Sequence, residues 1–94
     1  MGRRPAMIIQ NDDYGGSLPT ILVVPLTSSQ AASRFPGTTM VAATPASGLR
    51  IDSIAPVFQC LAIDRRQMLE KLGRVTDDER IRICAELLKL TGQG

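Results

Sequence analysis

The chain has 94 residues and a formal charge of only +2, from 11 basic and 9 acidic side chains. We expect one small domain, residues 1–94, and such domains are often stabilised by forming a homodimer. This net charge is too small to predict nucleic-acid binding by itself, so any nucleic-acid site would have to be a local patch. No run approaches the ~18 apolar residues that span a membrane, and no secretory signal opens the sequence.

Some residue types are absent or scarce, which limits the kinds of catalytic site that the chain can form. The chain has no histidine, which excludes histidine acid–base pairs, Cys-His dyads and Ser-His-Asp triads. Its two cysteines, Cys60 and Cys84, lie far apart without a CxxC motif, so we expect buried thiols in a reducing cytoplasm and neither zinc nor any other cofactor. Aromatic residues make up only 3% of the chain, which leaves few rings to stack bases.

The first predicted element is a β-hairpin. Two apolar runs, Pro5–Ile9 and Ile21–Leu26, flank a polar segment that is rich in turn-forming residues. Both runs are continuous rather than alternating, which is typical of strands covered on both faces. A turn centred on Gly15-Gly16 places Arg4 opposite Thr27, with Cβ atoms roughly 5 Å apart. A guanidinium and a hydroxyl would then meet at the open end of the hairpin and bind one phosphate.

The middle of the chain predicts short strands between loops. A strand is expected at Thr39–Ala43, and the next extended segment, Ile51–Ile63, is interrupted by Pro56. Asp64 is expected to cap a short helical turn, with Gln67 completing a capping box.

The last element is predicted to be an α-helix. Thr76 and Glu79 have capping-box spacing at its start, and Gly92 is suited to end it. An apolar stripe at helical spacing predicts a core or dimer face, and its members are Ile81, Cys84, Leu87 and Leu88.

Several segments carry a family resemblance. RRPAMIIQND, LPT, VVPLTSSQ and GLRIDSI, then Gln59 with Ile63-Asp64, then LEKLGRV before the last helix, resemble the MazF/PemK toxins of bacterial toxin–antitoxin pairs. The resemblance covers nearly the whole chain in order and spacing. It implies a mainly β fold with α, a small SH3-like β-barrel of the MazF/PemK/CcdB type with a C-terminal helix.

The same resemblance implies a function. The chain is expected to be a cytoplasmic, homodimeric, metal-independent endoribonuclease that cleaves single-stranded messenger RNA and inhibits translation and growth. Its products would carry a 2′,3′-cyclic phosphate, and its protein partner would be an antitoxin with an acidic disordered tail. Arg4 and Thr27 match the Arg and Thr that family ribonucleases use. The expected RNA-binding residues are Arg3, Ser28, Gln30 and Gln59.

This residue set suits RNA cleavage, because the nucleophile is the substrate's own 2′-hydroxyl. Arginine stays charged and matches phosphate oxygens bidentately, while a threonine hydroxyl donates to an oxygen or relays a proton. The protein needs only to orient the phosphate and stabilise the added negative charge.

Three departures from the family pattern leave rival interpretations open. Phe58 stands where the family typically has an acid, and Leu61 where it has an Arg. Phe58 is more often a core residue than a base-stacking one. Family members also begin about a strand and a loop earlier. We therefore expect this chain to be less stable and less active than a version that carries an added N-terminal strand and loop of the family type. The rivals are a catalytically weak dimer that binds antitoxin or RNA, and a small adaptor barrel unrelated to RNA.

Overall fold

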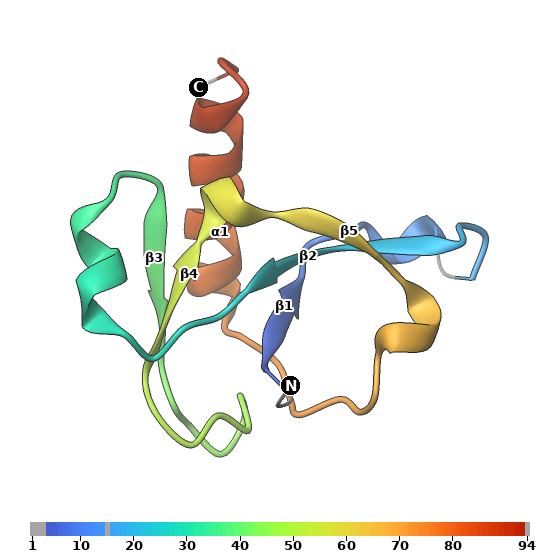
Figure 1. The fold of residues 1–94 in the computed structure, drawn as a ribbon, viewed down its shortest axis with the longest axis horizontal. Helices are drawn as coiled ribbons and strands as arrows, with labels where there is room; N and C mark the ends of the chain where they lie inside the picture. The colour runs from blue at the N-terminus through green and yellow to red at the C-terminus, as the bar shows by residue number, and fades with distance from the viewer. Residues whose placement is uncertain (1–3, 15, 94) are drawn as a thin grey trace.

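The computed structural model describes residues 4–14 and 16–93, and it is mainly β with one C-terminal helix. In the view of Figure 1 the helix α1 (Asp77–Leu90) lies beside β3 (Thr38–Val41) and behind β4 (Ser53–Pro56). The strands and the helix run as follows: β1 (Ala6–Ile8), β2 (Thr20–Pro25), β3 (Thr38–Val41), β4 (Ser53–Pro56), β5 (Leu61–Asp64) and α1 (Asp77–Leu90). Short 3₁₀ helices connect them: η1 (Asp12–Tyr14), η2 (Gln30–Arg34), η3 (Val57–Gln59) and η4 (Arg65–Gln67).

The predicted hairpin forms in the predicted register. β1 and β2 are antiparallel, with Ala6 opposite Pro25 and Ile8 opposite Val23, which is the pairing expected from a turn centred on Gly15-Gly16. Gly15 itself lies outside the described residues. β5 adds to the other edge of β2, so the sheet has the order β1-β2-β5.

A second sheet, β3-β4, joins the first at a single bridge. β2 ends at Pro25, and the Leu26 N–H still donates to Pro5 O at 3.0 Å. One residue later the Thr27 N–H donates to Ile54 O at 3.0 Å, and the Ile54 N–H donates back to Thr27 O at 2.7 Å. Within the described residues these pairings connect the two sheets without closing a ring of strands.

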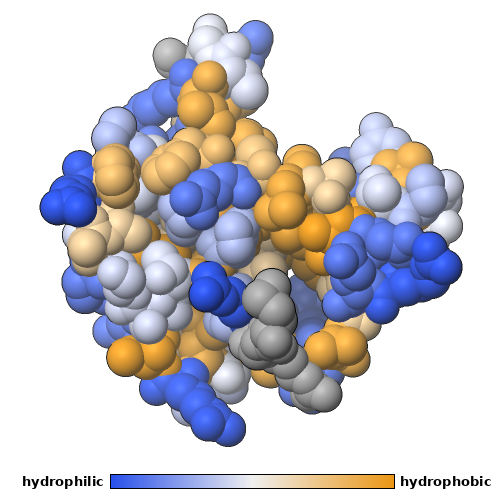
Figure 2. Space-filling model, in the orientation of Figure 1, coloured by the Kyte–Doolittle hydropathy of each residue, from blue (hydrophilic) through white to orange (hydrophobic). Residues whose placement is uncertain are grey.

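The core lies between the two sheets and α1. Its buried members are Met7, Val24, Leu26, Val41, Ala55, Val57 and Ile83. The expectation that the first strand is covered on both faces is wrong, since Ile8 is 42% exposed. The expectation is confirmed for the second strand, where Val23 and Val24 point to opposite faces and are both buried. Figure 2 shows apolar and polar side chains interspersed on the face of the molecule that is turned towards the viewer in Figure 1.

The start of α1 is pinned to the end of β3. Thr76 Oγ1 accepts the Glu79 N–H at 3.0 Å, and the Glu79 carboxylate accepts the Thr76 N–H at 2.9 Å, so the predicted capping box is confirmed. The other carboxylate oxygen accepts the Ala42 N–H at 2.8 Å. Burial would raise the pKa of Glu79, but the hydrogen bonds from Ala42 and Thr76 and the charge of Arg82 outweigh it and lower that pKa.

The apolar stripe predicted on the last helix is divided between two faces. Ile83 is fully buried and Leu87 packs against the core, whereas Ile81, Cys84 and Leu88 face outward. The expectation of two buried thiols is therefore wrong, because Cys84 is exposed and Cys60 is half-buried. Gly92, at φ 78°, ends the helix as expected. No helix in the described ranges has the length and apolar character needed to cross a membrane.

Two glycines allow the loop after β3 to cross the segment that leads into α1. A Cβ on Gly48, whose φ is 71°, would overlap the Leu72 carbonyl, and a Cβ on Gly73 would overlap the Ala46 carbonyl. The Arg74 N–H donates to Ala46 O at 2.8 Å beside this crossing. The glycine of the LEKLGRV segment therefore has a packing role.

Candidate functional site

The open end of the β1–β2 hairpin carries both residues predicted to be catalytic. The last hydrogen bond between these strands runs from Leu26 N–H to Pro5 O at 3.0 Å. Arg4 precedes Pro5 and Thr27 follows Leu26, so each lies one residue beyond that bond. Arg4 is exposed and Thr27 is half-buried. Among the described residues no hydrogen bond joins the two side chains, and the backbone of Thr27 pairs with Ile54 of β4.

The Thr27 hydroxyl is oriented by the backbone that follows it. Its Oγ1 accepts the Ser29 N–H at 3.1 Å, a local turn that threonine favours. A hydroxyl has one donor and two acceptor positions, so this bond leaves the hydroxyl hydrogen available to donate. A donor fixed in this way at the end of a strand can meet a phosphate oxygen.

Two further predicted residues follow directly. Ser28 and Gln30 are both exposed, and Gln30 opens η2. The Gln30 carbonyl accepts the Ser33 hydroxyl at 2.7 Å, which stabilises the turn while the Gln30 amide projects into solvent. Arg3 lies outside the described residues, so its predicted contact stays a prediction.

Gln59 reaches the same side of β2 through η3. Thr27 bridges Ile54 and Val23 pairs with Leu61, so η3 flanks β2 between these two points. The four residue steps from Val23 to Thr27 span about 13 Å. Measured along the direction of β2, Gln59 therefore lies within about 13 Å of Thr27. Gln59 is exposed, and its amide offers both a donor and an acceptor.

The preference for Phe58 as a core residue is wrong. Phe58 is 39% exposed, while its neighbour Val57 is fully buried. Its ring meets the Phe35 ring edge to face, with centroids 5.9 Å apart. The two rings are far apart in the sequence, so the sequence alone did not predict their contact. They meet because the antiparallel pairing of β3 with β4 brings together the segment before β3 and the segment after β4. Leu61, at the other departure from the family pattern, is also exposed.

The carboxylates of Asp52 and Asp64 accept hydrogen bonds that hold parts of the fold together. Asp52 accepts the Ala43 N–H at 2.7 Å. Asp64 caps η4 and pairs with Arg66 at 2.8 Å, and the bonds from the Arg66 side chain and backbone lower the pKa of Asp64. Among the described residues, no three Cys, Asp or Glu side chains lie close enough to hold a metal ion. Around the hairpin end Arg4 carries a guanidinium, Thr27 and Ser28 carry hydroxyls, and Gln30 carries an amide.

These features define a small β-rich domain with an exposed arginine and a half-buried threonine at the open end of its first hairpin. Residues 1–91 match the family model of the PemK-like, MazF-like toxin of type II toxin–antitoxin systems. The chain belongs to this family.

Named relatives agree with this assignment. The chain is 31% identical over 74 residues to Endoribonuclease MazF2 of Mycobacterium bovis and to Endoribonuclease MazF6 of Mycobacterium tuberculosis. The match covers 78% of this chain and 64% of each relative's length.

Solved structures confirm the MazF-like fold. The Mycobacterium tuberculosis toxin MazF-mt6 superposes with a TM-score of 0.84 at 15% identity, covering 97% of this chain and 88% of that one. A MazE-MazF structure (Form-I) from Deinococcus radiodurans gives a TM-score of 0.80 at 23% identity, covering 97% and 84%.

Proposed function

We propose that this chain is a toxin of a type II toxin–antitoxin system that cleaves single-stranded messenger RNA without a metal, in the cytoplasm, and so inhibits translation and growth. The observation that carries the proposal is the hairpin register, which brings Arg4 and Thr27 to one end of the sheet. The endoribonuclease names of the curated relatives support the same activity.

In the proposed mechanism, the ribose 2′-hydroxyl attacks the neighbouring phosphorus and the 5′-oxygen leaves, giving a 2′,3′-cyclic phosphate. Arg4 would bind the non-bridging oxygens and stabilise their added charge, an effect that is large for a preorganised donor. The Thr27 hydroxyl, held by the Ser29 N–H, would donate to the same phosphate. Ser28, Gln30, Gln59 and Arg3 would contact the neighbouring nucleotides.

The proposal is tested by incubating the purified chain with fluorogenic single-stranded RNA in EDTA and analysing the product ends. We expect products with cyclic phosphate ends, and we expect them to form even though EDTA removes metal ions. Absence of cleavage by purified chain at micromolar concentration would overturn the proposal.

One observation favours a second candidate, a catalytically weak binding module. Phe58 and Leu61 are exposed where family enzymes typically present an acid and an arginine, so a general base and a phosphate contact are replaced by apolar groups. A chain that binds uncleavable RNA or antitoxin tightly, but cleaves no faster than buffer, would be such a module.

We also propose that the active form is a homodimer and that an antitoxin with an acidic tail covers the RNA site. A MazE-MazF structure among the structural neighbours supports the protein partner. The outward apolar stripe on α1, formed by Ile81, Cys84 and Leu88, supports the dimer, because a second copy of the same stripe would cover it about a twofold axis.

The dimer gives a testable prediction. The melting temperature is expected to rise with protein concentration, since association stabilises the folded state by mass action. Ile81→Gln should abolish this dependence by removing apolar area from the stripe. Lys89→Gln, on another exposed face of the same helix, should preserve it. A parent chain that sediments as a monomer at tens of micromolar would contradict the prediction.

A further inference from the structure

We infer that the Phe35–Phe58 pair, with Arg34 and Gln59, is a binding site for one unpaired base of the RNA and its adjoining phosphate. The inference rests on the proposed function and extends it, because it assigns a base site to residues outside the Arg4–Thr27 end. We call these four residues the aromatic site.

The rings of the aromatic site are exposed and held in a fixed arrangement. Phe35 is 51% exposed and Phe58 is 39% exposed, and their planes meet at 66° with centroids 5.9 Å apart. Edge-to-face contact is a favourable geometry for two aromatic rings, and it leaves ring faces available to a third. Pro36 completes a solvent-open hollow of about 210 Å³ with these two rings. That volume is smaller than the sites that hold drug-sized ligands, about 300–1,000 Å³, and it suits a single planar group.

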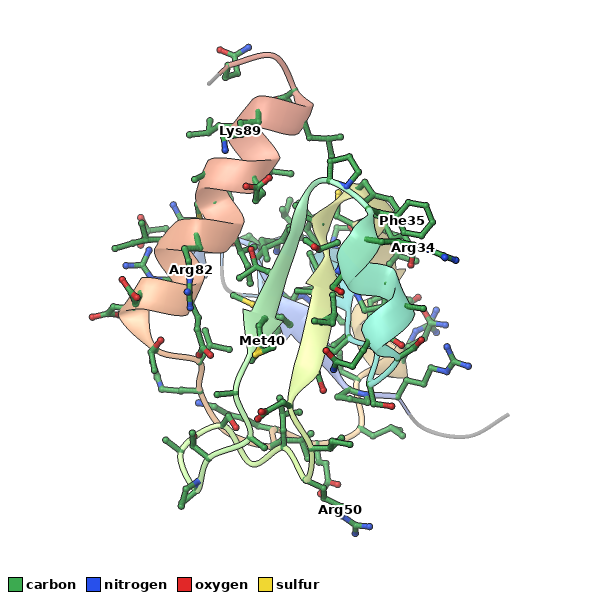
Figure 3. All side chains as sticks on the ribbon, turned by 90° about the vertical axis from the view of Figure 1, so that its left-hand side faces the viewer. Arg34, Phe35, Met40, Arg50, Arg82 and Lys89 are labelled. Atoms are coloured by element: carbon green, nitrogen blue, oxygen red, sulfur yellow. The ribbon has the colours of Figure 1, made fainter. Side chains whose placement is uncertain are left out.

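The charges beside the rings favour a nucleotide over a purely apolar ligand. The Arg34 guanidinium lies 5.7 Å from the centroid of the Phe35 ring, a cation–π position. Figure 3 shows Arg34, at the end of η2, and Phe35, directly after it, on the side of the molecule away from α1. Phe58 and Gln59 are consecutive in η3, so an amide that can donate to and accept from a base edge lies next to the stacking surface. A stacking ring, a cation and an amide match the base and phosphate of one nucleotide.

The aromatic site is also continuous with the proposed catalytic residues. Thr27 leads through Ser28 and Ser29 into η2, which ends at Arg34 and is followed directly by Phe35. At about 2 Å per residue, the five residues of η2 extend about 10 Å, and Ser28 with Ser29 adds at most about 7 Å. A single strand bound at Thr27 can therefore reach the aromatic site within a few nucleotides.

The test measures binding separately from cleavage. A short, mixed-sequence, fully 2′-O-methylated RNA lacks the nucleophile, so its fluorescence anisotropy reports binding alone. Phe58→Leu retains apolar volume but removes the π-face, and it is expected to weaken binding about 5- to 100-fold, the range for loss of one base–aromatic stack. Phe58→Tyr keeps the ring and should bind within about twofold of the parent. Tyr14→Leu is the matched control, because it removes an exposed aromatic outside the site.

Arg34 gives an independent readout. Arg34→Gln is expected to reduce the slope of log affinity against log salt by about 0.7, the value for one phosphate contact with a single strand. Phe58→Leu should leave that slope unchanged, because stacking releases no counterions. An unchanged slope in Arg34→Gln would overturn the phosphate contact.

The outcomes separate this inference from the proposed enzyme. A parent that binds RNA in a Phe58-dependent manner but does not cleave it supports the aromatic site and overturns the enzyme. A parent that cleaves RNA, with Phe58→Leu binding as tightly as Phe58→Tyr, overturns the aromatic site alone. Equal losses in Phe58→Leu and Tyr14→Leu, or a Phe58→Leu variant that loses antitoxin binding while RNA binding is unchanged, would also overturn it.

Discussion

Replacing Arg4 with alanine is expected to lower RNA cleavage at least about 100-fold, the scale of losing one preorganised donor to a developing negative charge. The melting temperature should hardly change, because Arg4 is exposed and precedes the first strand rather than filling the core. The measurement is the initial rate on a fluorogenic single-stranded RNA, paired with a thermal melt of the same preparation. The combination of lost activity and retained stability is what identifies a catalytic residue.

Arg50→Ala is the matched control for this prediction. Arg50 is also exposed, and it lies on the loop between β3 and β4, outside the residues proposed to contact RNA (Figure 3). Its replacement removes the same charge and should alter cleavage less than about threefold, because an exposed charge that does not contact the RNA acts only through the screened field. Equal rates for Arg4→Ala and the parent would remove Arg4 from the mechanism.

Replacing Glu79 with alanine is expected to lower the free energy of unfolding by about 2–4 kcal/mol at neutral pH. The carboxylate accepts the Ala42 N–H at 2.8 Å and the Thr76 N–H at 2.9 Å, and its side chain is buried. A buried donor left without an acceptor costs about 1–3 kcal/mol, and because these two are part-buried we expect about 1–2 kcal/mol for each. Denaturant unfolding of the two proteins measures the difference. Glu86→Gln, at a carboxylate that forms a surface ion pair with Lys89, should cost less than about 1 kcal/mol.

The Glu79 contribution should also depend on pH. Its folded-state pKa lies below the ordinary value of 4.5, so the unfolded chain binds a proton at a higher pH than the folded one does. The stabilisation by the ionised carboxylate is therefore fully present above pH 4.5 and is lost as the pH falls through the lowered pKa. As the pH falls from neutral to acidic, the free energy of unfolding of the parent should approach that of Glu79→Gln. A constant difference down to the acid limit would contradict this explanation.

The sequence by itself determined the local geometry. The glycine pair and the two apolar runs were sufficient to predict the β1–β2 register, because the pairing of a hairpin follows from the position of its turn. The capping boxes at Asp64 and Thr76 were likewise predictable, since each depends on residues only three positions apart. The Leu26–Pro5 hydrogen bond at the open end of the hairpin follows from the same local rules, whereas the joint action of Arg4 and Thr27 stays a prediction.

Only the tertiary structure decided which side chains meet across long separations. Thr27 pairs with Ile54, Glu79 binds Ala42, and Phe35 contacts Phe58. The periodicity of α1 also left open which apolar residues enter the core, and packing selected Ile83 while leaving Ile81 exposed. Periodicity describes one element at a time, whereas these contacts depend on how the second sheet docks against the first. The aromatic site could therefore be recognised only after η2 and η3 were placed side by side.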